Sequence, residues 1–390
     1  MTDGRRLGIA KAGRVRRAGA DVTIQLGAFV ISMGLLVALL AVLGYDAGKA
    51  VDALWTGSAG SLRALGLSLS EATPVILTAV AVWLAAQAGL FNIGADGQLQ
   101  MGGLAALLTV AHLGLPDSGP VLVVAGLVAA TVAGAAWSGI AGLMKTYRGA
   151  NEIVSTLMLN FIAAILISEM MKGPLQSAAN PYTPQTDPIP VVAQLPTMIG
   201  GTQLTWGFAL ALVVAVAVLV GVTRTTAGLR LRAIGLNRDA ALYSGVPVRR
   251  FWLGSMLASG ALCGLAGGLI ILGLRYYLTT GWASPWGYQG VLVAFLAMRS
   301  PYLIPVWGVL FGMLSTAGPA LKASASVPDS IVTLMQALPV VVLFVLYAAW
   351  RSLSGETLRS MMRPARGGTT PPAATPPTLD ESPAPSASGL

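Results

Sequence analysis

Long apolar stretches, separated by short polar segments, dominate the pattern along this chain. A helix needs about 20 residues to cross a bilayer. On that measure the pattern predicts spans near residues 22–44, 73–90, 97–115, 120–144, 153–171, 206–223, 251–274, 288–298, 302–320 and 330–350. The span at 288–298 is short. We therefore predict an all-α, polytopic membrane protein with about ten transmembrane helices, some of them short or interrupted.

The composition supports this class and excludes others. Of 390 residues, 55% are hydrophobic and 10% are charged, whereas soluble domains carry about 25% charged residues. The net charge of +9 is interpreted by location, because cytoplasmic segments of membrane proteins collect Lys and Arg, and it does not indicate nucleic-acid binding. The single cysteine, Cys263, lies in a predicted span, so we expect no disulfide and no metal site.

Four basic clusters predict the orientation in the membrane. They lie at residues 5–17, 145–148, 224–250 and 351–366. Counting spans alternately places all four on one side, which the positive-inside rule makes cytoplasmic. Both termini are then cytoplasmic, and the proline-rich loop 172–205 lies outside.

The chain is expected to divide into three parts. Residues 1–21 form a basic cytoplasmic segment, residues 22–351 form the transmembrane domain, and residues 352–390 form a cytoplasmic tail. The tail is rich in Pro, Ala and Ser and lacks apolar periodicity. We therefore expect it to be disordered.

A first polar cluster, Phe91–Gln98, interrupts an apolar region. It combines Asn92, Asp96 and Gln98 with two glycines. Ionisable groups at membrane depth are costly and usually mark a pathway or a site. An interrupted span is tolerated where its backbone is buried in protein or lines a cavity. This pattern predicts either a solute pathway or a short polar turn at the membrane surface, and the spacing alone leaves both open.

A second polar cluster occupies the segment Asn151–Asn160. Glu152, Thr156 and Asn160 are spaced by four residues, so they share one face of a helix. Such a stripe faces a water-filled path or a partner helix. Hydrogen bonds between helices would explain Thr156 and Asn160, and a carboxylate at residue 152 suits the positive end of a helix dipole. The structural and the pathway interpretations both remain open.

The basic loop 224–250 contains a third feature. A helix-forming run at 237–243 lies between two glycines, and Asn237 is suited to cap it. Ala240 and Ala241 would give this short helix a smooth face. A compact helix of this kind suits docking into a groove of another protein.

Small residues at every fourth position predict close helix packing. They are Ala130, Gly134, Ser138 and Gly142; Gly260, Gly264 and Gly268; and Gly308 with Gly312. We interpret them as contacts inside one subunit in preference to a dimer seam.

The sequence contains no motif for catalysis. It has no G-x-x-x-x-G-K-[ST] loop and no H-E-x-x-H, C-x-x-C or G-x-S-x-G pattern. The chain is therefore not expected to be an enzyme. If transport is driven, the energy comes from an ion gradient or from another polypeptide.

Three motifs together resemble the permease subunit of ATP-binding-cassette (ABC) importers. They are Phe91–Gln98, Asn151–Asn160, and Leu231–Asn237 leading into Ala240–Ala241. The resemblance runs from about Glu71 to Trp350 and is to the simple-sugar and nucleoside branch, which works with a basic-membrane-protein-type binding lipoprotein. It implies that 224–250 is a coupling loop for a separate ATPase, which binds ATP and Mg, so no cofactor is expected in this chain.

The resemblance also implies partners and a location. The partners are the ABC ATPase, a homologous second permease subunit in a heterodimer, and an extracytoplasmic solute-binding lipoprotein. The location is the bacterial cytoplasmic (inner) membrane. The implied pathway residues are Asn92, Gly94, Asp96, Gly97, Gln98, Glu152, Thr156 and Asn160. The implied coupling residues are Arg232, Gly235, Asn237, Ala240, Ala241 and Gly245.

A nucleoside is the expected solute, with a pentose or hexose as the alternative. The chain departs from the family pattern at Tyr276, Tyr277, Trp282 and Trp286 and at Met298–Pro301, which leaves the ligand open. A secondary transporter driven by protons, with Asp96 and Glu152 as its relay, is an alternative of another class.

Overall fold

The computed structural model describes residues 3–353, apart from residues 115, 117 and 284. Its helices are α1 (Asp3–Val42), α2 (Ala47–Ser58), α3 (Leu62–Gln87), α4 (Ala95–His112), α5 (Gly119–Arg148), α6 (Glu152–Lys172), α7 (Trp206–Arg224), α8 (Thr226–Leu236), α9 (Arg238–Tyr243), α10 (Val248–Ile270), α11 (Trp286–Leu296), α12 (Ile304–Ala325) and α13 (Asp329–Leu353). Short turns are η1 (Val191–Ala193), the π-helical η2 (Ile271–Arg275) and η3 (Pro301–Leu303). Over the described ranges, β-structure is confined to two isolated bridges.

The chain divides after Phe344 into two units, and the contacts described below belong to the first. Helix α1 begins at Asp3, inside the basic segment predicted for 1–21. The tail predicted for 352–390 lies outside the described residues from position 354 onward.

The helices confirm the all-α membrane fold. Seven are long and apolar enough to span a bilayer: α1 from Thr23, α3, α5, α6, α7, α10 with η2, and α12 with η3. Helix α11 and most of α13 are shorter apolar helices, as the pattern predicted for 288–298. Helix α2 was not predicted, because its 12 residues are too short and too polar for a span.

Helix α3 lies at the centre of the fold. In its most apolar window 83% of residues are buried, against 28% for α5, α6 and α7. It packs on α7, α10, α11 and α12. The outer faces of α5, α6 and α7 carry exposed Val and Ile side chains such as Val124, Val213 and Ile165, which suit contact with lipid.

The small-residue stripes form seams inside this chain. A Cβ added at Gly134 of α5 would lie 2.5 Å from the Cα of Gly264 in α10. One added at Gly312 of α12 would lie 2.4 Å from the carbonyl oxygen of Ser68 in α3. Only glycine permits such close backbone approach. The prediction of packing within one subunit is confirmed.

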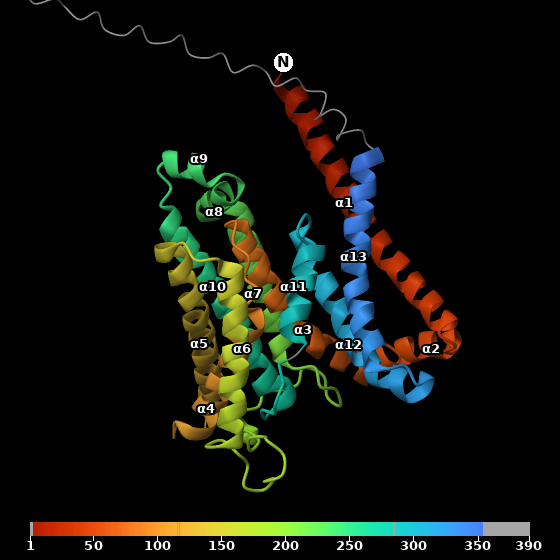
Figure 1. The fold of residues 1–390 in the computed structure, drawn as a ribbon, viewed down its shortest axis with the longest axis vertical. Coiled ribbons are helices and arrows are strands. Elements are labelled where there is room, and N and C mark those ends of the chain that lie inside the picture. Colours follow the sequence, from red (N-terminus) through yellow and green to blue (C-terminus); the bar gives the residue numbers. More distant parts are fainter. Residues whose placement is uncertain (1–2, 115, 117, 284, 354–390) are drawn as a thin grey trace, which may run out of the picture. The chain divides into compact units, whose positions relative to one another are not determined.

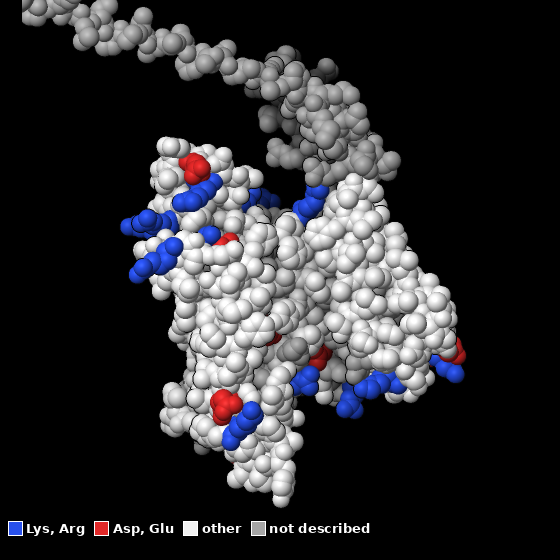
Figure 2. Space-filling model, in the orientation of Figure 1, with Lys and Arg blue, Asp and Glu red and all other residues white. Residues whose placement is uncertain are grey.

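Helices α8 and α9 lie at one end of the helical body and the loop 173–205 at the other (Figure 1). On the face drawn in Figure 2, Lys and Arg side chains gather around the α8–α9 end. Basic residues also occur toward the other end, where Arg63 lies in the first turn of α3 and Arg275 ends η2.

The loop 173–205 is attached to the end of α10. The π-helical turn η2 alters the regular hydrogen-bond ladder there. The carbonyl oxygen of Leu272 accepts from the backbone N–H of Leu195 at 2.7 Å, and that of Tyr276 accepts from Ile189 at 2.8 Å. These bonds fix the position of η2, whose last residue, Arg275, becomes important below.

Candidate functional site

The first polar cluster lies in the connection between α3 and α4. Helix α3 ends at Gln87, and α4 begins at Ala95. Asn92 is 0% exposed and Asp96 is 6% exposed. These polar side chains are therefore buried inside the protein, where an interruption of a span is tolerated.

Two buried amides pair with each other. Asn92 Nδ2 donates to Gln98 Oε1 at 2.9 Å, and Gln98 Nε2 donates to Asn92 Oδ1 at 2.9 Å. Asn92 also donates to the hydroxyl of Ser259 in α10 at 2.8 Å, and that hydroxyl donates to the carbonyl of Ala81 in α3 at 2.7 Å. These bonds tie the connection to two spanning helices.

The second polar cluster packs against the first. Asn160 Oδ1 of α6 accepts from the backbone N–H of Gly97 at 2.9 Å, and its Nδ2 donates to the carbonyl of Ile93 at 3.0 Å. Thr156 lies against Gly94, where an added Cβ would be 2.9 Å from the Thr156 Cβ. The two clusters thus form one structure, which we call the polar junction (Asn92, Gln98, Asn160 and Ser259).

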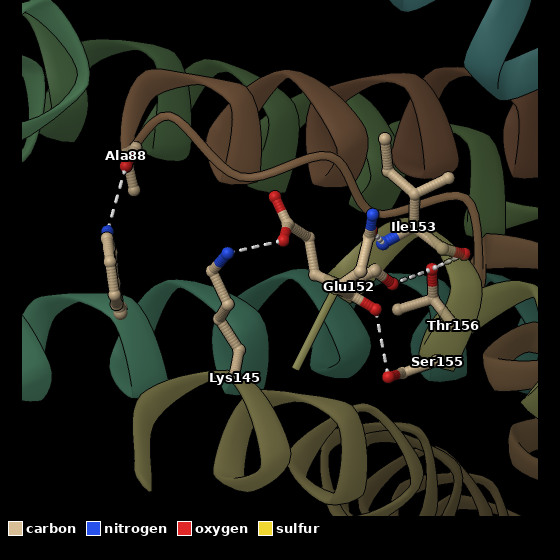
Figure 3. Close-up of polar contacts among 8 residues, drawn as sticks. Ala88, Lys145, Glu152, Ile153, Ser155 and Thr156 are labelled. Atoms are coloured by element: carbon tan, nitrogen blue, oxygen red, sulfur yellow. Dashed lines mark hydrogen bonds and ion pairs between the residues drawn. The ribbon is translucent and has the colours of Figure 1, made fainter. Parts of the chain in front are cut away.

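Glu152 lies at the start of α6 and forms an ion pair (Figure 3). Its Oε2 is 2.8 Å from Lys145 Nζ. Asn151 caps the helix by accepting from the N–H of Ile153 at 3.0 Å, and the hydroxyl of Thr156 donates to the carbonyl of Glu152 at 2.7 Å. Glu152 and Thr156 therefore have bonding partners within the protein, as the structural interpretation of this stripe requires.

Asp96 differs from its neighbours. Its Oδ2 accepts from Gln100 Nε2 at 2.8 Å, but its buried Oδ1 has no hydrogen-bond partner. Helix α11 packs on it closely, because a Cβ added at Gly287 would lie 2.5 Å from the Asp96 Cα. Of the predicted pathway residues, all within the described part of the chain, Asp96 alone has an unpaired buried atom.

The predicted coupling segment, α8 with α9, has the expected capped helix. Asn237 Oδ1 accepts from the backbone N–H of Ala240 at 3.0 Å, and Gly245 ends the segment with φ +78°. Ala241 is buried in a small apolar cluster, whereas Ala240 is exposed. The smooth outer face predicted for both alanines is therefore limited to Ala240. Arg232 donates to the carbonyl of Thr223 at 3.3 Å, within its own subunit.

The coupling segment touches the α3–α4 connection. A Cβ added at Gly235 would lie 2.3 Å from the carbonyl oxygen of Gln87 and 3.2 Å from the nitrogen of Gly89. Beside this contact, Trp252 Nε1 donates to the carbonyl of Ala88 at 3.2 Å (Figure 3). We call this contact the joint (Gly235, Gln87–Gly89 and Trp252).

Cations surround the Trp252 ring. The Arg238 guanidinium is 4.9 Å and the Lys145 ammonium 5.5 Å from its centroid, distances that allow cation–π attraction. Lys145 also pairs with Glu152. These contacts therefore link the joint to the start of α6 and to the first residue of α9. Sequence spacing held no signal for this arrangement.

A polar cavity of about 730 Å³ lies among α3, α11, α12 and α13. It is lined by Leu67, Glu71, Gln203, Leu274, Arg275, Pro285, Trp286, Gln289, Ser315, Thr316, Gly318, Pro319, Lys322, Thr333 and Gln336. We call it the α3–α13 cavity. None of the predicted pathway residues lines it.

One wall of the α3–α13 cavity is a charged aromatic group. Trp286 Nε1 donates to Glu71 Oε2 at 2.7 Å. Arg275 Nη2 lies 3.8 Å from Glu71 Oε1, and the guanidinium is 5.2 Å from the Trp286 ring centroid. The sequence singled out Trp286 only as a departure from the family pattern, and Glu71 just precedes the predicted span. The sequence signal for Glu71 was an acidic residue directly next to an apolar stretch.

The opposite wall is built from amides. Gln289 Nε2 donates to Ser315 Oγ at 3.0 Å and to Gln336 Oε1 at 2.9 Å, and Gln336 Nε2 donates to Ser315 Oγ at 3.2 Å. Gln289 is 1% exposed, and its Oε1 has no hydrogen-bond partner in the structure. Burying an acceptor without a partner costs about 1–3 kcal/mol.

Known proteins resemble this chain along most of its length. The guanosine ABC transporter permease protein NupP of Bacillus subtilis (strain 168) is 30% identical over 333 residues, 84% of this chain and 93% of that protein. The glucose ABC transporter permease protein TsgB13 of Haloferax volcanii is 31% identical over 338 residues, 84% of this chain and 87% of that protein. The nucleoside ABC transporter permease protein NupB of Lactococcus lactis subsp. cremoris is 30% identical over 331 residues, 81% and 88% of the two chains.

A family model agrees with these relatives. Residues 65–350 match the model described as the permease component of the branched-chain amino acid transport system. That range runs from the first turn of α3 to the last turn of α13 and takes in the polar junction, the joint and the α3–α13 cavity. The chain is a multi-pass membrane protein and belongs to this family of transport-system permeases.

Proposed function

We propose that this chain is the transmembrane subunit of an ATP-driven ABC importer that carries nucleosides across the cytoplasmic membrane. Two of the relatives described above are named for guanosine or nucleoside transport. The observation that carries the mechanism is the joint. Gly235 of the coupling segment lies against Gln87 and Gly89, so a force applied to α8 and α9 acts directly on the connection that enters the polar junction.

The ATPase is a separate subunit that docks on the coupling segment. Leu236 is 88% and Tyr243 is 91% exposed at this end of the chain, and a large apolar side chain exposed beside basic residues suits a protein interface. ATP and Mg are bound by that subunit, so the permease itself carries no cofactor.

Two further partners complete the importer. A homologous second permease subunit forms the other half of the pathway. An extracytoplasmic binding lipoprotein delivers solute at the loop 173–205, which lies at the end opposite α8 and α9 (Figure 1). Both termini and the coupling segment are then cytoplasmic, in accord with the basic clusters.

A simple sugar is the second candidate solute, because one relative at 31% identity is named as a glucose permease. The test is reconstitution of this chain with its ATPase, second permease subunit and binding lipoprotein in vesicles, followed by uptake of radiolabelled nucleosides and sugars. Nucleoside uptake that requires ATP and the binding lipoprotein supports the proposal. Uptake of sugars alone replaces the solute, and proton-driven uptake by this chain alone replaces the mechanism.

A further inference from the structure

The polar junction and the α3–α13 cavity differ in their capacity to hold a solute. At the junction, Asn92, Gln98 and Asn160 use their amide groups on one another or on the backbone. A solute would have to break those bonds to bind there. The α3–α13 cavity instead is a space of about 730 Å³ lined in part by polar side chains such as Gln203, Ser315 and Thr316.

The size and position of the cavity fit a small solute arriving from outside. Its volume of about 730 Å³ falls within the roughly 300–1,000 Å³ of typical ligand sites. Gln203, from the loop 173–205, contributes to its lining. The cavity therefore lies toward the end where the binding lipoprotein would release its cargo.

The chemistry of the walls favours a neutral solute with several hydrogen-bonding groups. The Glu71 carboxylate already has Arg275 and the Trp286 indole N–H as partners, so it does not require a cation. The facing wall consists of amide and hydroxyl groups from Gln289, Ser315 and Gln336. A nucleoside offers both N–H and O–H donors, together with acceptors, to such walls.

We propose that the α3–α13 cavity is an outward-facing holding site for a nucleoside, whose N–H and O–H groups form hydrogen bonds with polar side chains of the cavity lining. This inference rests on the proposed function, because it assigns a place to the solute of that importer. It also transfers the solute contact from the polar junction to a cavity whose lining includes none of the predicted pathway residues.

Thiol protection in the assembled complex tests the site. The native thiol, Cys263, is fully buried and gives no background. Thr316→Cys places a thiol on the cavity wall without touching the amide network, and Thr183→Cys places one on the exposed surface of the loop 173–205. Guanosine should slow labelling of the Thr316→Cys thiol by an impermeant reagent and leave the Thr183→Cys control unchanged.

A second pair of variants tests the polar lining of the cavity. In the Thr316→Cys background, Gln203→Met removes the amide of a lining side chain while keeping its approximate shape. The guanosine concentration that gives half protection should rise about threefold to tenfold, the effect of one hydrogen bond. Gln194→Met makes the same change in the loop 173–205 outside the cavity lining, so this variant should stay near the parent value. An unchanged labelling rate without solute shows that the cavity is intact.

The outcomes separate this inference from the proposed function. If the parent complex imports guanosine but guanosine does not protect the Thr316→Cys thiol, the holding site is refuted and the function stands. Equal effects of Gln203→Met and Gln194→Met overturn the role of the lining amide. If the complex imports glucose and not guanosine, and glucose alone protects the thiol, the nucleoside assignment fails.

Discussion

Replacing Gly235 by alanine tests whether the joint transmits force. The new Cβ would lie 2.3 Å from the carbonyl oxygen of Gln87 and 3.2 Å from the nitrogen of Gly89. Non-bonded heavy atoms prefer separations of about 3.5 Å or more, so α8 and the connection must part by about 1 Å. Both atoms belong to the backbone, and no flexible side chain can yield.

The energetic cost sets the size of the effect. Overpacking a close contact costs about 1–3 kcal/mol. This cost falls on the arrangement in which α8 rests on the connection, and a bias of that size changes an allosteric equilibrium about 5- to 150-fold. The stimulation of ATP hydrolysis by loaded binding lipoprotein should therefore decrease by a factor of about 5 to 150.

The assay measures ATP hydrolysis by the reconstituted complex with and without loaded binding lipoprotein. Gly221→Ala in α7 is the matched control, since it makes the same change in a helix and nothing lies within 4 Å of its new Cβ. Both variants gain the same helix propensity of about 1 kcal/mol. If Gly235→Ala retains stimulation equal to that of Gly221→Ala, the joint does not couple the subunits.

Three further predictions address the junction and the topology. Asn92→Ala leaves buried partners of Asn92 without hydrogen bonds and should lower the free energy of unfolding in detergent by about 1–3 kcal/mol; an unchanged thermal midpoint would contradict the network. Asp96→Asn should preserve uptake better than Asp96→Leu, whereas a proton relay predicts that the Asn variant is inactive. A cysteine at Gln185 should react with an external impermeant reagent and one at Arg238 should not; the reverse pattern would refute the orientation.

The features that the sequence predicted correctly are those that depend on residues close along the chain. The cap at Asn237 needs only the N–H of Ala240, three residues away. The shared face of Thr156 and Asn160 follows from helical spacing, and both face the α3–α4 connection. Helix α2 was not predicted because an amphipathic helix of 12 residues resembles a polar connection when spans are counted by length.

The remaining features depend on tertiary packing, which spacing does not encode. Glu71 meets Arg275 and Trp286 only because the π-helical turn η2 and the start of α11 return to the first half of α3. Gln289 and Gln336 look like ordinary polar residues in apolar helices until α11, α12 and α13 enclose them. Spacing therefore revealed the polar junction, whereas the cavity required the fold.

Helices α3 and α10 connect the joint to the cavity. Helix α3 carries Gln87 at the joint and Glu71 on the cavity wall, 16 residues or about 24 Å apart along the axis. Helix α10 carries Trp252 at the joint and continues into η2, which ends with Arg275 on the same wall.

The two helices are fastened to each other between these ends, where Ser259 donates to the carbonyl of Ala81 at 2.7 Å. A displacement at Gly235 is therefore expected to move both helices together, because a packed and hydrogen-bonded pair responds as one body. The Glu71–Arg275 ion pair would then be preserved during the movement, since its two residues belong to the moving body. Trp286 and Gln289 belong to α11 and Gln336 to α13, so a movement of α3 and α10 against these helices would act on the hydrogen bond from Trp286 to Glu71. The bonds from Asn92 to Ser259 and from Ser259 to Ala81 tie the α3–α4 connection to this pair, so the connection is expected to move with it.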